Sequence, residues 1–354
     1  MLVAGAVALA VTGTAYAAVG GPAWSRDGRS TPSSTTGTSS TTGRSSATGR
    51  SSAHDRSTTA AARPVAGTSC PTFPADNWWH ADVRGLPVDS HSKAWLSHMS
   101  TGLDLHPDFG PSYGDGPNYG IPITVVKHSH PRVRVRFQYA KESDRVRYPL
   151  GRDTRIEGGR RSSGDRHAIV VDKGSCKLFE TYATRKRDGR WHAGSGAVWS
   201  LTSDRLRPDG WTSADAAGLP ILPGLLRWNE VRHHDIDHAI RFTTDVTSTH
   251  HLWPARHDAG SRTSRKYPPM GARFRLKASY HPSGFGKNAL AVVHAMKKYG
   301  LVLADNGSPW YFQGEQNGHW PGRFVEQLKR IPANRFVAVD TSSLKVSADS
   351  GATH

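Results

Sequence analysis

The chain has 354 residues, two cysteines and a formal net charge of +17 at pH 7. Neither cysteine belongs to a CxxC metal or redox motif, and no segment reaches the run of about 20 apolar residues that a membrane-spanning helix needs. Residues 20–69 hold six Arg and two Asp, so the rest of the chain keeps 40 Lys and Arg against 27 Asp and Glu.

The N-terminus is typical of an exported protein. Leu2–Val11 is an unbroken run of apolar and small residues, and Ala15-Tyr16-Ala17 matches a small-x-small cleavage site. This order predicts a signal peptide over residues 1–18, although no Lys or Arg precedes the apolar run. A start site further upstream and a disordered Ala-rich N-terminus are the alternatives. We expect a secreted, extracellular protein.

Residues 19–69 are rich in Ser, Thr, Gly and Arg and contain almost no apolar residues. Such a segment cannot repay the conformational entropy lost on ordering, so we expect a disordered linker. A linker of this length would let the body reach away from a cell wall or membrane. The protein is therefore also a candidate for cell-wall association.

Cys70 and Cys176 both lie beyond the expected signal peptide. An oxidising compartment favours a disulfide between them, which would join the first residues of the body to a central hairpin. Two unrelated buried thiols are the alternative.

The first half of the body reads mainly as short strands. Residues 92–100 predict a short helix, and the strands follow at 121–127 and 132–139. In the second strand, apolar side chains alternate with Arg134, Arg136 and Gln138, which indicates a half-buried strand. A hairpin is predicted from strands 167–171 and 177–182 around a turn at 172–175. Residues 191–201 predict another strand, interrupted at Gly194 and Gly196 by a bulge or a close approach.

The second half combines strands with two helices. The predicted strands are 238–243, 272–279, 301–304 and 336–339, and the predicted helices are 287–299 and 323–330. Frequent Pro and Gly favour strands and turns over long helices. We expect residues 70–346 to form one mostly β domain, a β-sandwich or jelly-roll-like body with a few peripheral helices, with α+β as the alternative. Residues 347–354 are expected to be a flexible tail.

Three segments carry a resemblance to a known family: 208–220 (PDGWTSADAAGLP), 253–257 (WPARH) and 304–308 (ADNGS). Together they resemble an uncharacterised family of secreted bacterial proteins, mostly from high-GC Gram-positive soil bacteria. The resemblance covers essentially the whole body from Phe73 onward. It implies secretion and a single domain, and it implies no activity and no catalytic residues.

The first candidate site lies on the predicted hairpin. His167 and Glu180 are close in sequence register, and one register places them on the same face as Tyr182. A His beside a carboxylate can act as an acid/base pair, and Glu157 would add the second carboxylate that glycosidic cleavage uses. A structural hydrogen bond at a sheet edge is the alternative.

The second candidate joins His257 with Asp305 as catalytic residues and Arg256 as a binding residue. Arg256 and His257 follow Trp253-Pro254, and Asp305 follows a predicted strand. Polar residues at strand ends often line sites. The aromatic residues near these two segments could bind sugars with their flat faces, and they are Trp253, Trp310 and Tyr311. An Asx-turn and ordinary core aromatics are the alternative.

Two further segments carry weaker signals. Trp211 with Asp215 is better explained by an Asp that caps a short turn. The segment 233–238 (HHDIDH) is dense in metal-ligand types, but its spacing matches no helical zinc pattern, so we expect no metal. Gly284–Asn288 lacks the first Gly and the Ser/Thr of a phosphate-binding loop, so we expect no nucleotide and no other cofactor.

The positive charge of an exported body suggests an anionic partner, and a general Arg bias that serves solubility is the alternative. The basic runs 132–136 and 185–187 are not interleaved with aromatic residues, unlike a single-strand nucleic-acid binder. We expect a monomer that acts on extracellular or cell-wall polysaccharide, anionic or neutral, as a glycoside hydrolase or polysaccharide lyase. A non-catalytic polysaccharide-binding protein and a surface interaction protein are the alternatives.

Overall fold

Strands outweigh helices in this protein, whose structure is a computed structural model that describes residues 62–112, 117–159 and 161–354. Strands account for 27% of the described residues and helices for 15%, and the strands of this part of the chain form three sheets. This result confirms the prediction of a mostly β, sandwich-like body with few helices. The expected signal peptide and residues 19–61 of the expected linker lie outside the described residues.

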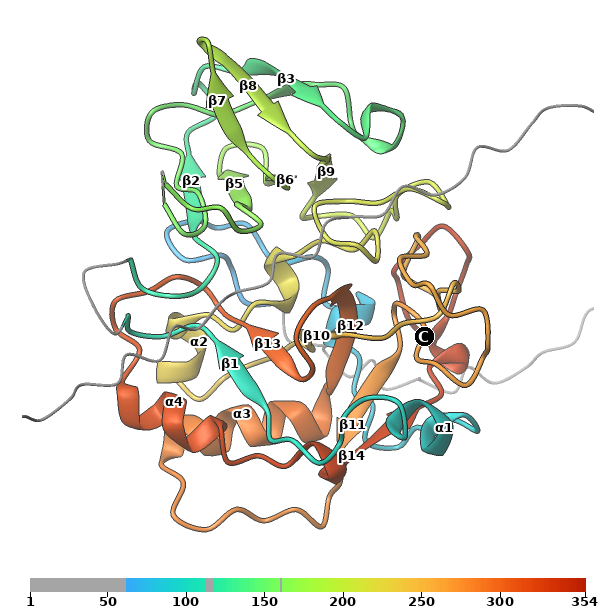
Figure 1. The fold of residues 1–354 in the computed structure, drawn as a ribbon. Helices are drawn as coiled ribbons and strands as arrows, with labels where there is room; N and C mark the ends of the chain where they lie inside the picture. Colours follow the sequence, from blue (N-terminus) through green and yellow to red (C-terminus); the bar gives the residue numbers. More distant parts are fainter. Residues whose placement is uncertain (1–61, 113–116, 160) are drawn as a thin grey trace, which may run out of the picture. The chain divides into compact units, whose positions relative to one another are not determined.

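Two four-stranded sheets form a β-sandwich at one end of the body (Figure 1). The outer sheet has the order β4 (Arg147–Tyr148), β3 (Val133–Phe137), β8 (Arg190–Ala193) and β7 (Arg185–Arg187). The middle sheet has the order β2 (Ile123–Val126), β5 (Ala168–Asp172), β6 (Lys177–Thr181) and β9 (Gly196–Ser200). Their facing side chains, including Tyr148, Phe179 and Trp191, make a small apolar core.

The middle sheet is buried on both faces. Val170 and Phe179 face the outer sheet, whereas Ile169 and Leu178 belong to the main core on the other side. All five residues of β5 are therefore buried, as expected for a strand with protein on both faces. Glu180 pairs with Ile169 across the hairpin, so its side chain points toward the main core.

The third sheet, here called the large sheet, has six strands. Its order is β1 (His106–Asp108), β13 (Tyr311–Gln313), β10 (Ile240–Thr244), β12 (Leu301–Asn306), β11 (Arg273–Leu276) and β14 (Phe336–Val339). One face is apolar, because Phe242, Phe274 and Phe312 lie in registers that share it. Helices α3 (Lys287–Lys298) and α4 (Gly322–Leu328) run along this side (Figure 1).

Across β1, β13 and β10, the opposite face of the large sheet is polar and is directed at the middle sheet. Arg241 and Thr243 of β10 share this face with Gln313 of β13 and Asp108 of β1, because strand partners point the same way. Arg241 packs against Gly224 of the 3-10 turn η3 (Leu222–Gly224). A Cβ added to Gly224 would lie only 2.9 Å from the Cβ of Arg241. A polar layer therefore lies inside a mostly apolar body.

The remaining helices are short. Helix α1 (Ser92–Leu96) contacts β14, and α2 (Trp228–Arg232) contacts α3. The predicted helices 92–100, 287–299 and 323–330 are all present, the first of them shorter than expected. Within the described residues, no helix combines the length and apolar character needed to cross a membrane.

One strand prediction needs correction. Residues 191–201 form two strands, β8 and β9, which belong to different sheets. The chain crosses between them at Gly194 and Gly196, where an added Cβ would lie 2.6 Å from Tyr182 and 2.4 Å from Phe137. On β11, the Arg273 side chain is 1% exposed, and its guanidinium carbon lies 4.4 Å from the Trp78 ring centre.

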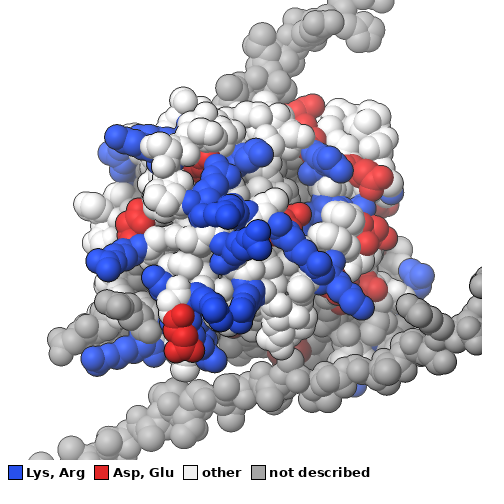
Figure 2. Space-filling model, turned by 90° about the horizontal axis from the view of Figure 1, so that it is seen from above, with Lys and Arg blue, Asp and Glu red and all other residues white. Residues whose placement is uncertain are grey.

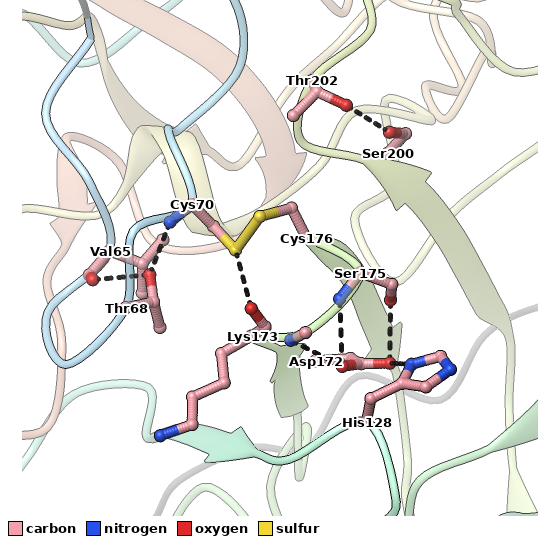
Figure 3. The surroundings of a disulfide bond; sticks show 11 residues. Val65, Thr68, Cys70, His128, Asp172, Lys173, Ser175, Cys176, Ser200 and Thr202 are labelled. Atoms are coloured by element: carbon pink, nitrogen blue, oxygen red, sulfur yellow. Dashed lines mark hydrogen bonds and ion pairs between the residues drawn. A yellow bond between two sulfur atoms is a disulfide. The ribbon is translucent and has the colours of Figure 1, made fainter.

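The predicted disulfide between Cys70 and Cys176 is present (Figure 3). It ties the start of the body to the β5–β6 turn. In that turn Oδ1 of Asp172 accepts hydrogen bonds from the backbone N–H groups of Gly174 and Ser175, at 3.0 and 3.3 Å. The predicted turn at 172–175 therefore has a defined chemical cause.

The ends of the body differ from expectation. Ala62 and Val65 are buried, so ordered packing begins before Cys70. The segment 347–354, expected to be a flexible tail, is held by hydrogen bonds: the Trp78 N–H donates to Gly351 O at 2.7 Å, and Arg256 pairs with Asp349 at 2.8 Å. These ends are held by contacts with residues far away in the sequence, and the local composition gives no sign of such contacts.

Candidate functional site

The polar face of the large sheet is built around Arg241, which is 2% exposed. Its guanidinium donates two hydrogen bonds to Asp215, Nε to Oδ2 at 3.0 Å and Nη2 to Oδ1 at 2.7 Å. The same Nη2 lies 3.7 Å from Oδ2 of Asp305. A buried charge is tolerated only with such partners, so Arg241 organises the carboxylates around it.

A β-bulge directs Asp305 toward Arg241. Arg241 pairs with Val302 and Phe242 with Leu303, but Thr243 then pairs with Asp305 rather than with Ala304. In an unbroken strand Asp305 would share the face of Leu303, the apolar one. The extra residue moves it to the polar face that Arg241 and Thr243 occupy, as bulges near functional sites often do.

Asp305 is a carboxyl group whose pKa is raised by its surroundings. Burial raises its pKa well above the usual value, and the neighbouring charge of Asp215, with which it shares a hydrogen bond, raises it further. Two adjacent carboxyl groups cannot both ionise easily, and Arg241 holds Asp215 with two bonds. The Asp305 side chain is 25% exposed, so solvent or a ligand can reach this carboxyl group.

Glu157 has the opposite character. Burial opposes its ionisation, but the His167 ring and backbone N–H both donate to its Oε2, at 2.6 and 3.1 Å, and the net effect lowers the pKa of Glu157. The side chain is 26% exposed. Glu157 is therefore an accessible carboxylate that stays ionised.

His167 acts as the cation that supports Glu157. Its Nδ1 faces Glu157, and its Nε2 lies 3.2 Å from Ala214 O, so both ring nitrogens face acceptors. Burial opposes the charge, but the carboxylate of Glu157 outweighs it and raises the pKa of His167 to about 9. At neutral pH the ring is an imidazolium, which positions Glu157 and cannot itself accept a proton.

A fourth carboxyl group completes the arrangement. Asp108 of β1 pairs in register with Gln313 and shares a side-chain hydrogen bond with it. Burial and the nearby charge of Glu157 raise the pKa of Asp108 to about 6. Gln313 is 6% exposed, and its Oε1 has no hydrogen-bond partner among the described residues. We call Asp108, Glu157, Asp215 and Asp305, with Arg241 and His167, the carboxylate cluster.

Two tyrosines lie beside the cluster. The Tyr182 ring lies 5.8 Å from the His167 ring, and burial together with the charges of Asp165 and Asp305 raises its pKa. Tyr311 is the register partner of Thr243, which also pairs with Asp305, so the two share one face of the sheet. Both rings are partly exposed. They are the predicted binding aromatics that lie near the acids.

Glu180 does not take the catalytic position that we predicted. The β5–β6 register places it on the same face as His167 and Tyr182, but its side chain is fully buried. Its carboxylate accepts hydrogen bonds from the backbone N–H groups of Ile221 and Leu222 at 2.9 and 2.8 Å. Burial raises the pKa of Glu180 to about 7. It fastens η3 to the middle sheet and cannot touch a substrate.

The predicted grouping of Arg256 and His257 with Asp305 is not formed. The intervening Ala217 donates its N–H to Ala304 O and accepts from Arg256 N. His257 Nδ1 lies 2.9 Å from Ala216 O, and Arg256 binds the C-terminal segment through Ala348 O at 2.9 Å. Both residues therefore serve the loop packing behind the cluster.

Two predicted sugar-binding tryptophans also belong to the framework. Trp310 is fully buried, stacks on Phe242 at 5.3 Å and donates its Nε1–H to Met99 O. Trp253 donates its Nε1–H to Ser350 O at 2.9 Å and packs edge-on against Trp78. Trp310 cannot stack on a sugar, because no face of its ring is exposed.

The His- and Asp-rich segment folds into an internal ion-pair network. Asp237 and His238 bring ligand atoms within 4.8 Å of those of Glu230. However, Glu230 already has Arg227 Nη2 at 2.6 Å and His238 Nε2 at 2.8 Å, and His238 Nδ1 donates to Ala239 O. Arg227 and His238 therefore already contact the two oxygens of Glu230 that a metal ion would need.

Sequence reasoning missed Arg241, Asp108 and the role of Asp215. Arg241 had a usable signal, because it lies between Ile240 and Phe242 in a predicted strand. A charged residue between two apolar ones in a strand marks a polar position on one face of the sheet. Asp108 lies on a three-residue strand with no detectable periodicity. The role of Asp215 could not be predicted, because its partner Arg241 is distant in the sequence.

An open cavity of about 740 Å³ lies away from the cluster, at the disulfide end of the β5–β6 hairpin. It is lined by Lys127, His128, Lys173 and Gly174 together with residues 67–69. His167 is at the other end of the same hairpin, so this cavity is separate from the cluster. No protein-family model, curated protein or solved structure matches this chain.

Proposed function

We propose that this chain is a secreted enzyme that hydrolyses polysaccharide with Asp305 as the general acid and Glu157 as its carboxylate partner. One observation carries the proposal. Two partly exposed carboxyl groups beside one buried arginine have pKa values pushed in opposite directions, up for Asp305 and down for Glu157. Such a divided pair is the requirement for glycosidic cleavage at neutral pH.

The chemistry follows from the protonation states. The Asp305 carboxyl gives its proton to the glycosidic oxygen as the bond from that oxygen to the anomeric carbon breaks. Glu157 faces the positive charge that develops on the sugar, and either attacks the anomeric carbon or takes the proton of the attacking water. Asp305 loses its proton beside Arg241, 3.7 Å away, which stabilises the new carboxylate.

The surroundings suit a sugar. Tyr182 and Tyr311 offer partly exposed rings near the acids, and amphipathic rings of this kind bind the flat apolar side of a pyranose. Asp108, with a pKa near 6, can accept a hydrogen bond from a hydroxyl. These groups would position the chain of sugars against Asp305.

The test is product release from a panel of acidic and neutral polysaccharides, followed by mass spectrometry. We expect Asp305→Asn and Glu157→Gln each to lower the rate by about 10²–10⁴ while the melting temperature stays close to that of the wild type. Asp258→Asn is the matched control, because Asp258 pairs with His251 on the surface. Wild-type rates in both site variants, or no product from any polymer, would contradict the proposal.

A second function is favoured by a separate observation. The outer sheet presents a strongly basic surface (Figure 2), and a non-catalytic polysaccharide-binding protein would need only such a surface. This alternative predicts binding that weakens with salt, with no product in the same tubes. The product assay above therefore separates the two functions directly.

A further inference from the structure

The outward face of the outer sheet carries only basic side chains. Registers place Val135 and Trp191 on the inner face, in contact with the sandwich core, so the alternate positions point outward. The outward positions are Arg134, Arg136, Arg147, Arg185, Arg187, Arg190 and His192. We call these seven residues the basic face, and Figure 2 shows the dense positive charge on this side of the molecule.

This arrangement costs stability. Arg134 lies directly opposite Arg147, and Arg187 lies opposite Arg190. Like charges in such directly opposite cross-strand positions destabilise a sheet. Within the described part of the chain, none of the six arginines forms an ion pair with a carboxylate.

The fold does not require this charge. The inner face needs apolar residues to build the core, but an outward position on a strand accepts any polar side chain. Opposite charges across the strands would stabilise the sheet, and a solubility function is met by mixed charges. A surface that carries only positive charges, although these charges repel one another, indicates a negatively charged ligand.

We propose that the basic face binds a linear acidic polysaccharide that carries carboxylates on its sugar units. This inference rests on the proposed function, which names a polysaccharide as the substrate, and it adds that the polysaccharide is negatively charged. Basic groups repeat at about 4.8 Å between strands and at about 6.8 Å along each strand, which gives an extended polyanion many partners. Arginine forks bind carboxylates with two parallel hydrogen bonds, which lysines cannot do.

The same surface is poorly suited to nucleic acid. No aromatic side chain lies at the seven outward positions, so the face lacks the stacking platform of single-strand binders. In the described part of the chain, the only helical element next to this sheet is the short 3-10 turn η2 (Ala140–Glu142), so no α-helix is available there to enter a major groove (Figure 1). The basic face is therefore better suited to charge contacts with a flexible acidic polymer than to nucleic acid.

The experiment measures binding of the full chain to polygalacturonate, at about 50 mM and about 200 mM salt. The Asp305→Asn variant is used throughout, so that cleavage cannot consume the polymer and a failure of the proposed catalysis does not affect the result. The basic-face variant replaces four arginines with Gln, and they are Arg134, Arg136, Arg187 and Arg190. The control variant makes the same charge change at exposed positions elsewhere, and these are Arg152, Arg232, Arg323 and Arg335.

We expect the basic-face variant to lose about tenfold or more in affinity at the lower salt and the control to lose far less. The melting temperature of the basic-face variant should not fall, because repulsion is relieved. Equal loss in both variants would show that only net charge matters and would overturn the inference. So would absence of binding, or tighter binding of duplex DNA or of anionic phospholipid vesicles at equal salt.

Discussion

The ion pair between His167 and Glu157 should make the stability of this protein depend on pH in a defined direction. The pKa of His167 is about 9 in the folded protein against 6.5 for an ordinary histidine. A group whose pKa is raised by folding contributes stability that is complete below its unfolded pKa. That contribution is lost as the pH rises from 6.5 to about 9. We therefore examine His167→Gln, which keeps an N–H donor near Glu157 but carries no charge.

The magnitude follows from the size of the shift. A difference of one pKa unit corresponds to about 1.4 kcal/mol, so His167 contributes about 3 kcal/mol at about pH 6 and almost nothing at about pH 9.5. His167 is 4% exposed, so solvent screens the interaction little. The assay is urea unfolding of the full chain, with the disulfide intact, for wild type and variant at both pH values.

The difference in unfolding free energy between the two proteins should shrink by about 3 kcal/mol from the lower to the higher pH. Other groups that titrate in this range, including Glu180, are present in both proteins and largely cancel. Parallel curves for wild type and variant would refute the reasoning, because they would mean that His167 is not charged in the folded state.

Three other changes test the framework of the site, each by urea unfolding. Replacing Cys70 and Cys176 with Ala opens a loop with a sequence separation of 106 and should cost about 4–5 kcal/mol, measured against the wild type with its disulfide intact. Gly194→Ala places a Cβ 2.6 Å from the Tyr182 ring and should cost about 1–3 kcal/mol. Arg241→Met leaves a buried carboxylate without its partner and should cost about 3–5 kcal/mol at neutral pH but less in acid. Losses below about 0.5 kcal/mol would contradict each assignment.

Local sequence patterns predicted the strands that lie near the surface or form tight hairpins. The β3 alternation and the β5–β6 turn follow from side chains within a few residues of each other, such as Asp172 with Gly174 and Ser175. The strands β1 and β13 were missed because they have three residues each and gain their order from pairing with each other across the chain. Short strands of this kind have no periodicity to detect.

The candidate site was predicted in part for the same reason. His167, Glu157 and Asp305 were recognised as chemical groups, and the structure brings them to one buried arginine. Glu180 was misjudged because a carboxylate that binds backbone N–H groups and one that faces solvent look alike in sequence. The position of Asp305 depends on a one-residue bulge, which only the register with β10 reveals.

The disulfide determines how mechanical load would enter the body. Cys70 is bonded to Cys176, so tension applied to the chain before Cys70 passes through the sulfur atoms into the β5–β6 hairpin. From Cys176 the chain reaches β8 at Arg190 without passing through residues 71–175. If a polymer held the β7 and β8 positions of the basic face while the N-terminal side was pulled, the covalent path from Cys176 to them would run through β6, β7 and β8. That path contains neither Asp108 nor Glu157.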